Sequence, residues 1–377
     1  TGYSLQRTAE DLIIDGADSI ICGEPYHNWK EIRDFIIDDN NTIPKNVITD
    51  LTLGRSPERF IEKNTIYPYP AWDLINLENY WNLPYSHGPK TKKYLPVLTS
   101  RGCPYPCDFC VVPETNNRRW RSNSPEEVVK ELIYLKNKFG VLDFQIEDLN
   151  PTVDYRRWEQ ICNILISIKA NIRFYFVSGT KAETIHIEQV PLLAKAGCWY
   201  ISISPESGSR KLMKKIGKKF DYLHGLKLIS SCYEYGIKTQ TCFIVGHPSE
   251  TIEDFELSRS YLHELVKAGV DEVAIFVTSP FPGSNIYKSQ SIKILDKNTV
   301  LTFSPKGREN YNRIEIRRNK LIKDFLFKKL QINFFNFLNQ CLRSLFGTPK
   351  TKIENLPRRV LYIFFLIIRN KIIKIEK

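Results

Sequence analysis

Three cysteines lie close together in residues 99–110, which read TSRGCPYPCDFC. Cys103, Cys107 and Cys110 have the spacing C-x3-C-x2-C, and clustered thiolates bind zinc or iron-sulfur clusters. A structural zinc needs about four ligands, so His87 or a distant cysteine would have to complete such a site. A four-iron cluster held by only three thiolates keeps one iron open for a small molecule. The pattern therefore favours an iron-sulfur cluster, with zinc as the alternative.

The rest of the composition is typical of a globular protein in a reducing compartment. The 377 residues, 42% of them hydrophobic, are enough for one large core or two domains. Most of the nine cysteines are scattered singly rather than in the dense framework of a small secreted domain, and no secretory signal opens the sequence. We therefore expect a cytoplasmic protein whose clustered thiols bind metal.

Six short apolar runs separated by helical patterns predict the framework that positions these cysteines. The predicted strands are residues 95–99, 142–147, 173–178, 199–204, 239–245 and 272–278. The clearest helix is 124–139, where Ser124 is the expected N-cap, Pro125 the first helical residue and Glu127 the partner in a capping box. Strands that alternate with helices predict a right-handed parallel α/β sheet, either doubly wound or curled into a partial barrel.

Polar or glycine-containing segments follow every predicted strand directly. After the cysteine loop, these segments are IEDLN (146–150), VSGT (177–180), SPESGS (204–209), VGHPSET (245–251) and TSPFPGS (278–284). Parallel α/β sheets bind their ligands at the carboxyl ends of the strands. The sequence therefore predicts one ligand-binding rim that contains the cysteines and all of these segments.

The cysteine spacing, the aromatic Phe109 before the last cysteine and the segments SPESGS, VGHPSET and PFPGS resemble the radical S-adenosylmethionine (SAM) superfamily. The resemblance extends over residues 90–290 and is to the subset with an N-terminal cobalamin-binding domain. It implies a partial (β/α)6 TIM-like barrel. It also implies that Cys103, Cys107 and Cys110 hold a 4Fe-4S cluster, that SAM chelates the open iron, and that reductive cleavage of SAM gives a 5′-deoxyadenosyl radical.

The resemblance also implies which residues lie near SAM and the cluster. Phe109 is expected to shield the cluster from water. Glu147 takes a position near the SAM amino group, although the family's paired glycines are missing here. The alternative is that Glu147 and Asp148 are simply a pair of carboxylates in a solvated loop. Ser178 takes the position of a ribose contact.

Two further segments hold expected SAM contacts. Glu206 takes the position of a contact to the ribose or the methionine, with capping of a helix N-terminus as its alternative. Gly246 and Pro248 take the position of backbone laid against the adenine, where a glycine allows close approach. His247 is expected to be a packing residue, and no catalytic residue is assigned.

Residues 1–36 resemble the last strand and helix of a Rossmann-like cobalamin-binding domain, with an αβ cap as the alternative. The matching positions are Asp18, Ile20, Ile21, Gly23 and Glu24. Such a domain needs ~100 residues to bury its own core, and the sequence starts at Thr1 without an initiator methionine. We therefore expect a truncated domain that cannot hold cobalamin in this chain. The expected divisions are a remnant at 1–40, a linker at 41–90, the barrel at 91–300 and a basic helical extension at 301–377.

The positive charge of the chain belongs to the C-terminal extension. The net charge is +12, and residues 301–377 hold 18 Lys and Arg against 5 Asp and Glu, which is +13 and leaves −1 for residues 1–300. Apolar residues at helical spacing predict one stripe of Leu326, Leu330, Phe334, Phe337, Leu338, Cys341, Leu342 and Leu345. A second segment from Arg358 has nine consecutive apolar residues, too few for the roughly 20 of a spanning helix.

Three interpretations of the extension follow. Helices packed on the barrel are the default, a basic anchor at a membrane surface is the second, and a nucleic-acid patch is disfavoured because the stripe is apolar. The localisation that we expect is therefore cytoplasmic, with membrane association as a variant.

Taken together, these features predict a radical SAM enzyme that methylates an unactivated carbon with the help of cobalamin. Its expected partners are a small-molecule or lipid-like substrate and an electron donor such as flavodoxin or ferredoxin. One alternative is a radical cyclase, oxidase or rearrangement enzyme that uses the same cluster. The non-enzymatic alternative is a zinc or iron-sulfur binding module whose tail docks to membrane or nucleic acid.

Overall fold

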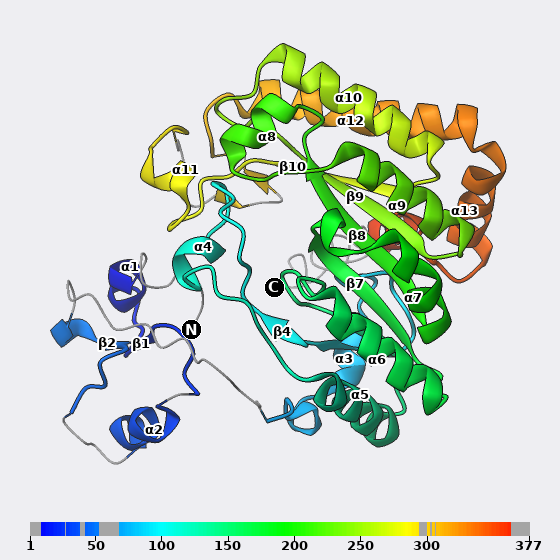
Figure 1. Cartoon of the computed structure of the whole chain (residues 1–377). Helices are drawn as coiled ribbons and strands as arrows, with labels where there is room; N and C mark the ends of the chain where they lie inside the picture. The colour runs from blue at the N-terminus through cyan, green and yellow to red at the C-terminus, as the bar shows by residue number, and fades with distance from the viewer. Residues whose placement is uncertain are drawn as a thin grey trace, which may run out of the picture.

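The computed structural model describes residues 9–26, 28–37, 42–52, 68–293, 300–301, 304–305 and 307–362. Its centre is a six-stranded sheet (Figure 1) of β3 (Tyr94–Val97), β6 (Asp143–Ile146), β7 (Arg173–Thr180), β8 (Cys198–Glu206), β9 (Lys238–Val245) and β10 (Glu272–Val277). All six predicted strands are confirmed, and no end differs by more than two residues. Apolar runs bounded by polar segments were sufficient to locate them.

The strand order excludes one of the two predicted topologies. The order across the sheet is β10-β9-β8-β7-β6-β3, and every neighbouring pair is parallel. A doubly wound sheet reverses its strand order at a switch point, whereas here each strand lies beside its successor. The sheet is therefore the partial (β/α)6 TIM-like barrel, and the doubly wound alternative is wrong.

Helices cover the outer face of this sheet (Figure 1). They are α5 (Pro125–Phe139), α6 (Tyr155–Ser167), α7 (Val190–Ala196), α9 (Tyr222–Glu234) and α10 (Ile252–Lys267). Trp158 of α6 lies between two rings of β7, with centroids 5.3 Å from Phe174 and 4.6 Å from Phe176. Large buried rings dominate the energy of such a core, so they fix α6 on the sheet.

The start of α5 confirms the predicted N-cap but not the whole capping box. Ser124 Oγ accepts a hydrogen bond from Glu127 N at 3.2 Å. Within the described residues, the Glu127 carboxylate does not return a bond to Ser124 and instead lies 3.8 Å from Lys130 Nζ. The reciprocal box occurs at α10, between Thr251 and Asp254.

Before β3, the structure describes α1 (Ala9–Ile14), β1 (Ile20–Ile21), α2 (Trp29–Ile37), β2 (Val47–Ile48) and α3 (Leu77–Trp81). β1 pairs antiparallel with β2, which belongs to the predicted linker. An ion pair of 2.6 Å joins Glu24 Oε2 to Arg121 Nη1 of the barrel, and both side chains are largely buried. Residues 1–8 of the predicted remnant and 53–67 of the predicted linker lie outside the described residues.

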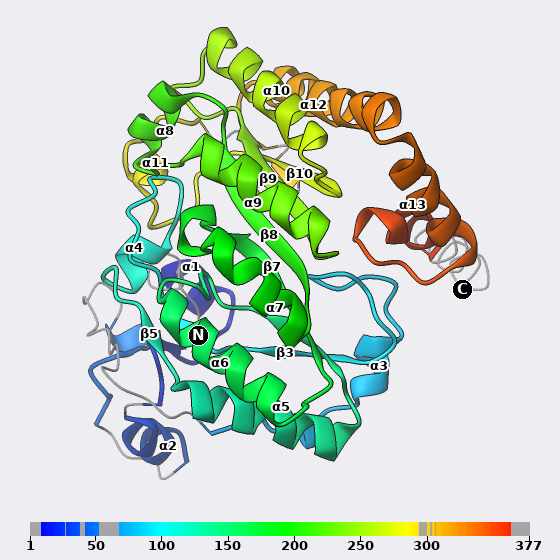
Figure 2. The ribbon, with the colours of Figure 1, turned by 45° about the vertical axis from the view of Figure 1, so that its right-hand side comes forward.

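The C-terminal extension packs on the barrel, but the predicted single stripe is wrong. α12 (Tyr311–Ile332) lies along α10 (Figure 2) and buries Ile314, Leu321 and Phe325. The helix ends at Ile332, and the next residue, Asn333, donates from its side chain to Val266 O at 2.7 Å. Helix α13 (Phe334–Phe346) begins directly after Asn333. The predicted stripe is therefore divided between two helices, and much of the α13 part is exposed.

The segment after α13 reaches both edges of the open barrel. Ile353 N donates to the Glu272 carboxylate of β10 at 2.8 Å, and the Asn355 amide donates to Pro84 O before β3. The extension therefore covers the open side between β3 and β10. Within the described part of the chain, no helix is long and apolar enough to cross a bilayer. Residues 363–377, most of the second apolar segment, lie outside it.

Lys329 of α12 predicts a measurable pH dependence of stability. Its ammonium donates to the carbonyls of Val270 and Asp271, and burial lowers the pKa of Lys329 to about 8. Between this value and ~10.5 the unfolded chain binds more protons than the folded chain, so Lys329 makes the free energy of unfolding rise with pH in this range. Relative to a Lys329→Met variant, the original chain should gain up to ~3 kcal/mol in urea unfolding from pH 8 to 10.5. If the difference in the free energy of unfolding between the two proteins stays constant from pH 8 to 10.5, the lowered pKa of Lys329 is contradicted.

Candidate functional site

The cysteine loop lies on the rim formed by the carboxyl ends of the strands. It runs from β4 (Ser100–Arg101) to α4 (Val112–Thr115). Asp108 N donates to Ile216 O at 2.9 Å, and Asp108 O accepts from Ile286 N at 3.2 Å. These bonds join the loop to α8 (Arg210–Ile216) and α11 (Asn285–Lys288), so the loop has a defined position before any cofactor binds.

The three thiols suit a cationic cluster. All three are half-buried, and burial raises the pKa of Cys103, of Cys110 and of Cys107, the last to about 12. The negative charges of Glu206 and of the other two thiolates contribute to the raised pKa of Cys107, whereas Lys218 opposes the shift. Val112 N donates to Cys110 Sγ at 3.4 Å. Ionising three half-buried thiols costs free energy when no cation is near, and bound iron stabilises the thiolates. The three thiols therefore fit the predicted cluster. Among the described residues, no three His, Cys, Asp or Glu side chains are arranged for a single metal ion.

Glu206 and Lys218 form a buried ion pair beside these thiols. Lys218 Nζ lies 2.7 Å from Glu206 Oε1, and each side chain is 8% exposed. Burial acts to lower the pKa of Lys218, but the Glu206 carboxylate and the thiolate of Cys107 together outweigh it, and the pKa is raised. Glu206 is also held at φ +60°, a strained value that persists where the surroundings impose it. The site therefore contains a permanently charged ammonium next to Cys107.

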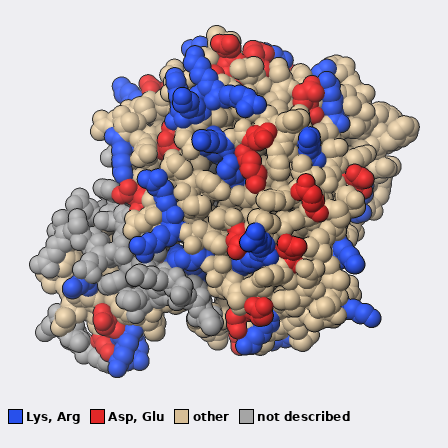
Figure 3. Space-filling view, viewed as in Figure 1, with Lys and Arg blue, Asp and Glu red and all other residues tan. Residues whose placement is uncertain are grey.

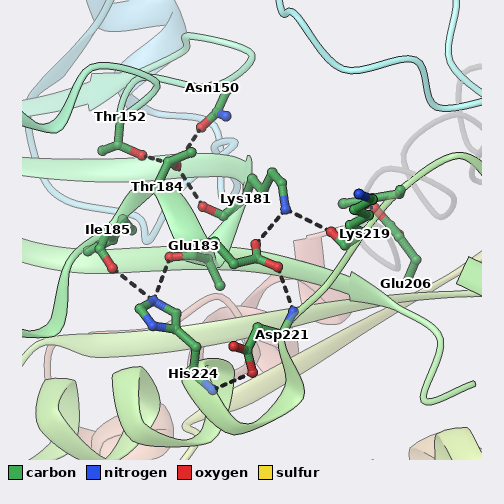
Figure 4. A network of polar contacts seen from close by, with 12 residues as sticks. Asn150, Thr152, Lys181, Glu183, Thr184, Ile185, Glu206, Lys219, Asp221 and His224 are labelled. Atoms are coloured by element: carbon green, nitrogen blue, oxygen red, sulfur yellow. Dashed lines mark hydrogen bonds and ion pairs between the residues drawn. The ribbon is translucent and has the colours of Figure 1, made fainter. Parts of the chain in front are cut away.

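A second polar network holds the turn that carries Lys218 (Figure 4). Lys181, just after β7, donates to Glu183 Oε2 and to Lys219 O, both at 2.7 Å. Glu183 Oε1 accepts from Asp221 N at 2.6 Å. The Lys181 ammonium also lies 5.3 Å from the ring centroid of Tyr105 in the cysteine loop. This network links the loop after β7 to the turn after α8, and so fixes the position of Lys218.

The carboxylates that end β6 have different surroundings. Asp148 is fully buried and accepts from Thr99 N and Thr99 Oγ1, both at 2.6 Å. Asp148 therefore holds the first loop of the rim in place, and is not the solvated carboxylate considered above. Glu147 is partly exposed and lies 2.6 Å from His87 Nδ1. Ser178 lies on the rim at the end of β7 and is partly exposed.

The turn after β9 is held by packing against α12 and by two hydrogen bonds of Gly246. Gly246 has φ +78°, and a Cβ there would lie 2.7 Å from Ile314 Cγ2 of α12. Its N–H donates to Glu250 Oε2 at 2.9 Å, and its carbonyl accepts from Arg308 Nη2 at 3.0 Å. The neighbouring Pro248 is exposed. The close approach that requires glycine is thus to α12, which the sequence did not predict.

His247 connects this turn to the cysteine loop. Its Nδ1 accepts from Ser249 N at 3.1 Å, so its Nε2 carries the hydrogen and donates to Asp108 Oδ2 at 3.0 Å. His247 is 6% exposed. The expectation of a packing role is therefore refined, because the side chain also positions the loop.

Replacement of His247 by alanine should loosen the cysteine loop. The partly exposed Asp108 carboxylate would lose this donor, and a hydrogen bond to a charged group contributes about 1.5–3 kcal/mol. We expect a lower melting temperature and less iron retained after anaerobic reconstitution. His247→Gln, whose amide can donate from a similar place, should recover most of both. Equal iron content in the alanine variant and the original would contradict the role.

A cavity of about 890 Å³ lies between the strands and the C-terminal segment. Its walls come from β7 to β10, the linker before β3, α12 and the C-terminal segment, and include Tyr85, Tyr94, Phe109, Gly179, Ser204, Glu206, Gln240, Phe276, Phe281, Leu356 and Arg359. Of the predicted SAM contacts and the shielding ring, Phe109 and Glu206 line it. Glu147, Ser178, Gly246 and Pro248 do not, so the structure does not bring them together there.

Sequence reasoning missed two residues of the site, Lys218 and Asp108. Lys218 follows Glu206 by 12 residues, beyond any local spacing rule, and stands among several other lysines. Asp108 lies inside the cysteine motif, so only its side-chain contact with a distant turn identifies it. A search for one buried cation opposite SPESGS could have suggested Lys218.

The comparisons with known proteins give a family and a fold. Residues 97–262 match the model of the radical SAM superfamily. An uncharacterized methyltransferase of Pyrococcus horikoshii is 24% identical over 235 residues, which cover 62% of this chain and 48% of the relative. Cytidylyl-2-hydroxyethylphosphonate methyltransferase of Streptomyces wedmorensis is 27% identical over 233 residues, 59% of this chain and 42% of the relative. The chain thus spans less than half the length of these relatives.

A solved structure shows the same fold. The radical SAM methyltransferase TsrM from Kitasatospora setae, with a tryptophan substrate and a SAM analog bound, aligns with a TM-score of 0.61 at 18% identity, over 77% of this chain and 57% of TsrM. A second TsrM structure, with cobalamin and a [4Fe-4S] cluster bound, aligns with a TM-score of 0.59 at the same identity, over 76% of this chain and 57% of TsrM.

Proposed function

Because residues 97–262 of this chain match the model of the radical SAM superfamily, we propose that Cys103, Cys107 and Cys110 hold a 4Fe-4S cluster and that the protein cleaves SAM reductively. The observation that carries the proposal is the set of three half-buried thiols on the strand-end rim, beside the buried ammonium of Lys218. When bound, the cluster supplies the electron that breaks a carbon–sulfur bond of SAM and gives a 5′-deoxyadenosyl radical.

Residues of this chain would prepare that site. The Lys218 ammonium offsets the negative charge of thiolates, and Glu206 keeps it protonated. Phe109 lies on the cavity wall between Cys107 and Cys110 in sequence, where its ring would exclude water from the cluster. We further propose Glu206 as a SAM contact, because it is the predicted contact that lines the cavity. Glu147, Ser178, Gly246 and Pro248 stay proposed contacts from the family resemblance.

The overall reaction that we propose is methylation of an unactivated carbon. Support comes from two relatives and one structural neighbour that are called methyltransferases. The described residues before β3 do not fit cobalamin, because three short helices and one pair of two-residue strands enclose too little volume. We therefore propose no cobalamin site within the described residues, and keep residues 1–40 as a proposed remnant, 41–90 as linker, 91–300 as barrel and 301–377 as extension.

Anaerobic reconstitution with iron and sulfide, followed by EPR of the reduced protein with and without SAM, tests the proposal. A reduced-cluster signal that changes when SAM is added is expected, together with formation of 5′-deoxyadenosine. S-adenosylhomocysteine among the products would support methyl transfer over cyclisation, oxidation or rearrangement. Zinc retained without any such signal would overturn the radical proposal in favour of a binding module.

The C-terminal extension is proposed to contact an anionic membrane surface, while the barrel stays cytoplasmic. On α13, Phe335, Leu345 and Phe346 are 79%, 63% and 84% exposed. The whole extension carries a net charge of +13. Exposed apolar side chains on a basic segment are typical of interfacial helices.

The membrane contact should depend on these exposed rings. A Phe335→Ser, Phe346→Ser variant is expected to lose most of its co-sedimentation with phosphatidylserine vesicles, because about 1.5–3 kcal/mol is gained by burying each ring. Leu74→Ser with Ile252→Ser, at side chains that are 83% and 65% exposed elsewhere, is the matched control. Equal sedimentation of both variants would refute the contact.

A further inference from the structure

Five basic side chains form an exposed patch on and directly after α8. This patch, the α8 patch, consists of Arg210, Lys211, Lys214, Lys215 and Lys219. Residues 210–220 contain no Asp or Glu, and within the described residues none of the five side chains forms an ion pair. Figure 3 shows basic side chains gathered over α8 on this face. The other residues of 1–300 hold fewer Lys and Arg than Asp and Glu, so this concentration of positive charge is local.

The α8 patch adjoins the cysteine loop. Ile216 O, at the end of α8, accepts from Asp108 N at 2.9 Å. A Cβ on Gly217 would lie 2.9 Å from Pro106 O of the loop. The Lys181 bond to Lys219 O holds the turn after α8 in the network of Figure 4. A protein seated on the α8 patch would therefore lie against the loop that carries the predicted cluster ligands.

The proposed reaction requires an electron from outside the chain. Electron-transfer partners meet in small, transient interfaces, and complementary charge steers them to the correct face. We propose that the α8 patch is the docking surface for a small acidic electron-donor protein, of the flavodoxin or ferredoxin kind. This inference rests on the proposed cluster.

The position of the α8 patch favours this partner over other polyanions. The exposed apolar rings that a membrane contact needs lie on α13, away from the cysteine loop (Figure 1). In the docked complex, one electron passes from the reduced flavin or iron-sulfur centre of the partner to the cluster. The partner is thereby oxidised by one electron and the cluster reduced by one, and no bond to the chain is formed.

Charge reversal of the α8 patch provides the test. Lys211 and Lys215 are four residues apart, on one side of α8, and Lys211→Glu, Lys215→Glu should weaken binding of flavodoxin about tenfold or more at low salt. The rate of cluster reduction by reduced flavodoxin should fall to a similar extent. Reduction by dithionite should not change, because this small reductant needs no docking surface. Lys195→Glu, Lys227→Glu, at exposed lysines of α7 and α9, is the control with the same change of charge.

The outcomes separate this inference from the proposed function. Absence of a reducible cluster in the original protein would refute the proposed function. The docking surface alone would be refuted if dithionite reduces the cluster but the α8 variant binds flavodoxin no more weakly than the control variant. This includes the case in which neither variant weakens the binding. Loss of binding to anionic vesicles or single-stranded DNA in the α8 variant, with flavodoxin binding intact, would assign the α8 patch to that polyanion and overturn the proposal.

Discussion

Replacement of Cys107 by alanine is expected to abolish both the reduced-cluster EPR signal and the formation of 5′-deoxyadenosine from SAM. The proposed four-iron cluster has only three protein ligands, and two thiols are too few to hold it. The loss of the signal and of the product should therefore be complete rather than partial. Iron and sulfide analysis after anaerobic reconstitution, EPR and product chromatography would measure it. Because Cys107 is half-buried in a loop rather than in the core, the variant should fold, and circular dichroism should match that of the original protein.

Cys341→Ala is the matched control, since Cys341 is a half-buried thiol of α13, outside the cysteine loop. It should retain the cluster and the activity. If Cys107→Ala keeps full iron content and SAM cleavage, then Cys107 is not a ligand and the assignment of the loop fails. If both variants lose iron equally, the loss reflects general instability.

The sequence was most informative where structure follows from local pattern. The six strands were located because each is a short apolar run bounded by polar residues. Their loops fall on one rim because all parallel strands point the same way. The apolar pattern alone did not distinguish a doubly wound sheet from a barrel, since strand order depends on pairing between segments and not on the pattern within them. The barrel was expected only from the family resemblance.

Contacts over long sequence distances were not predictable. Asn355 meets Pro84 across 271 residues, so closure of the barrel by the extension has no local signal. The break at Asn333 also depends on tertiary structure, because its amide bonds to Val266 of a different helix. The helical spacing of apolar residues from 326 to 345 continues through this break. The sequence therefore predicted one continuous apolar stripe, whereas the structure divides it between two helices.

The second large effect is expected at the buried ion pair. Lys218→Met would leave the buried Glu206 carboxylate without its cation, and breaking a buried pair in this way costs about 3–5 kcal/mol. Urea unfolding of the metal-free protein should show this loss. SAM cleavage should also fall to background, because the ammonium that offsets the charge of the thiolates is removed. Lys218→Arg, which keeps the charge, should retain most of the stability.

The double variant Glu206→Gln, Lys218→Met separates stability from function. With both charges removed, no uncompensated ion stays buried, and replacement of a whole pair is often nearly neutral. The double variant should therefore unfold at a urea concentration close to that of the original protein, while SAM cleavage stays at background. Recovery of activity together with stability would mean that the pair only supports the fold. Recovery of stability alone would show that the pair is a functional part of the cluster site, through the Lys218 ammonium, the proposed SAM contact of Glu206, or both.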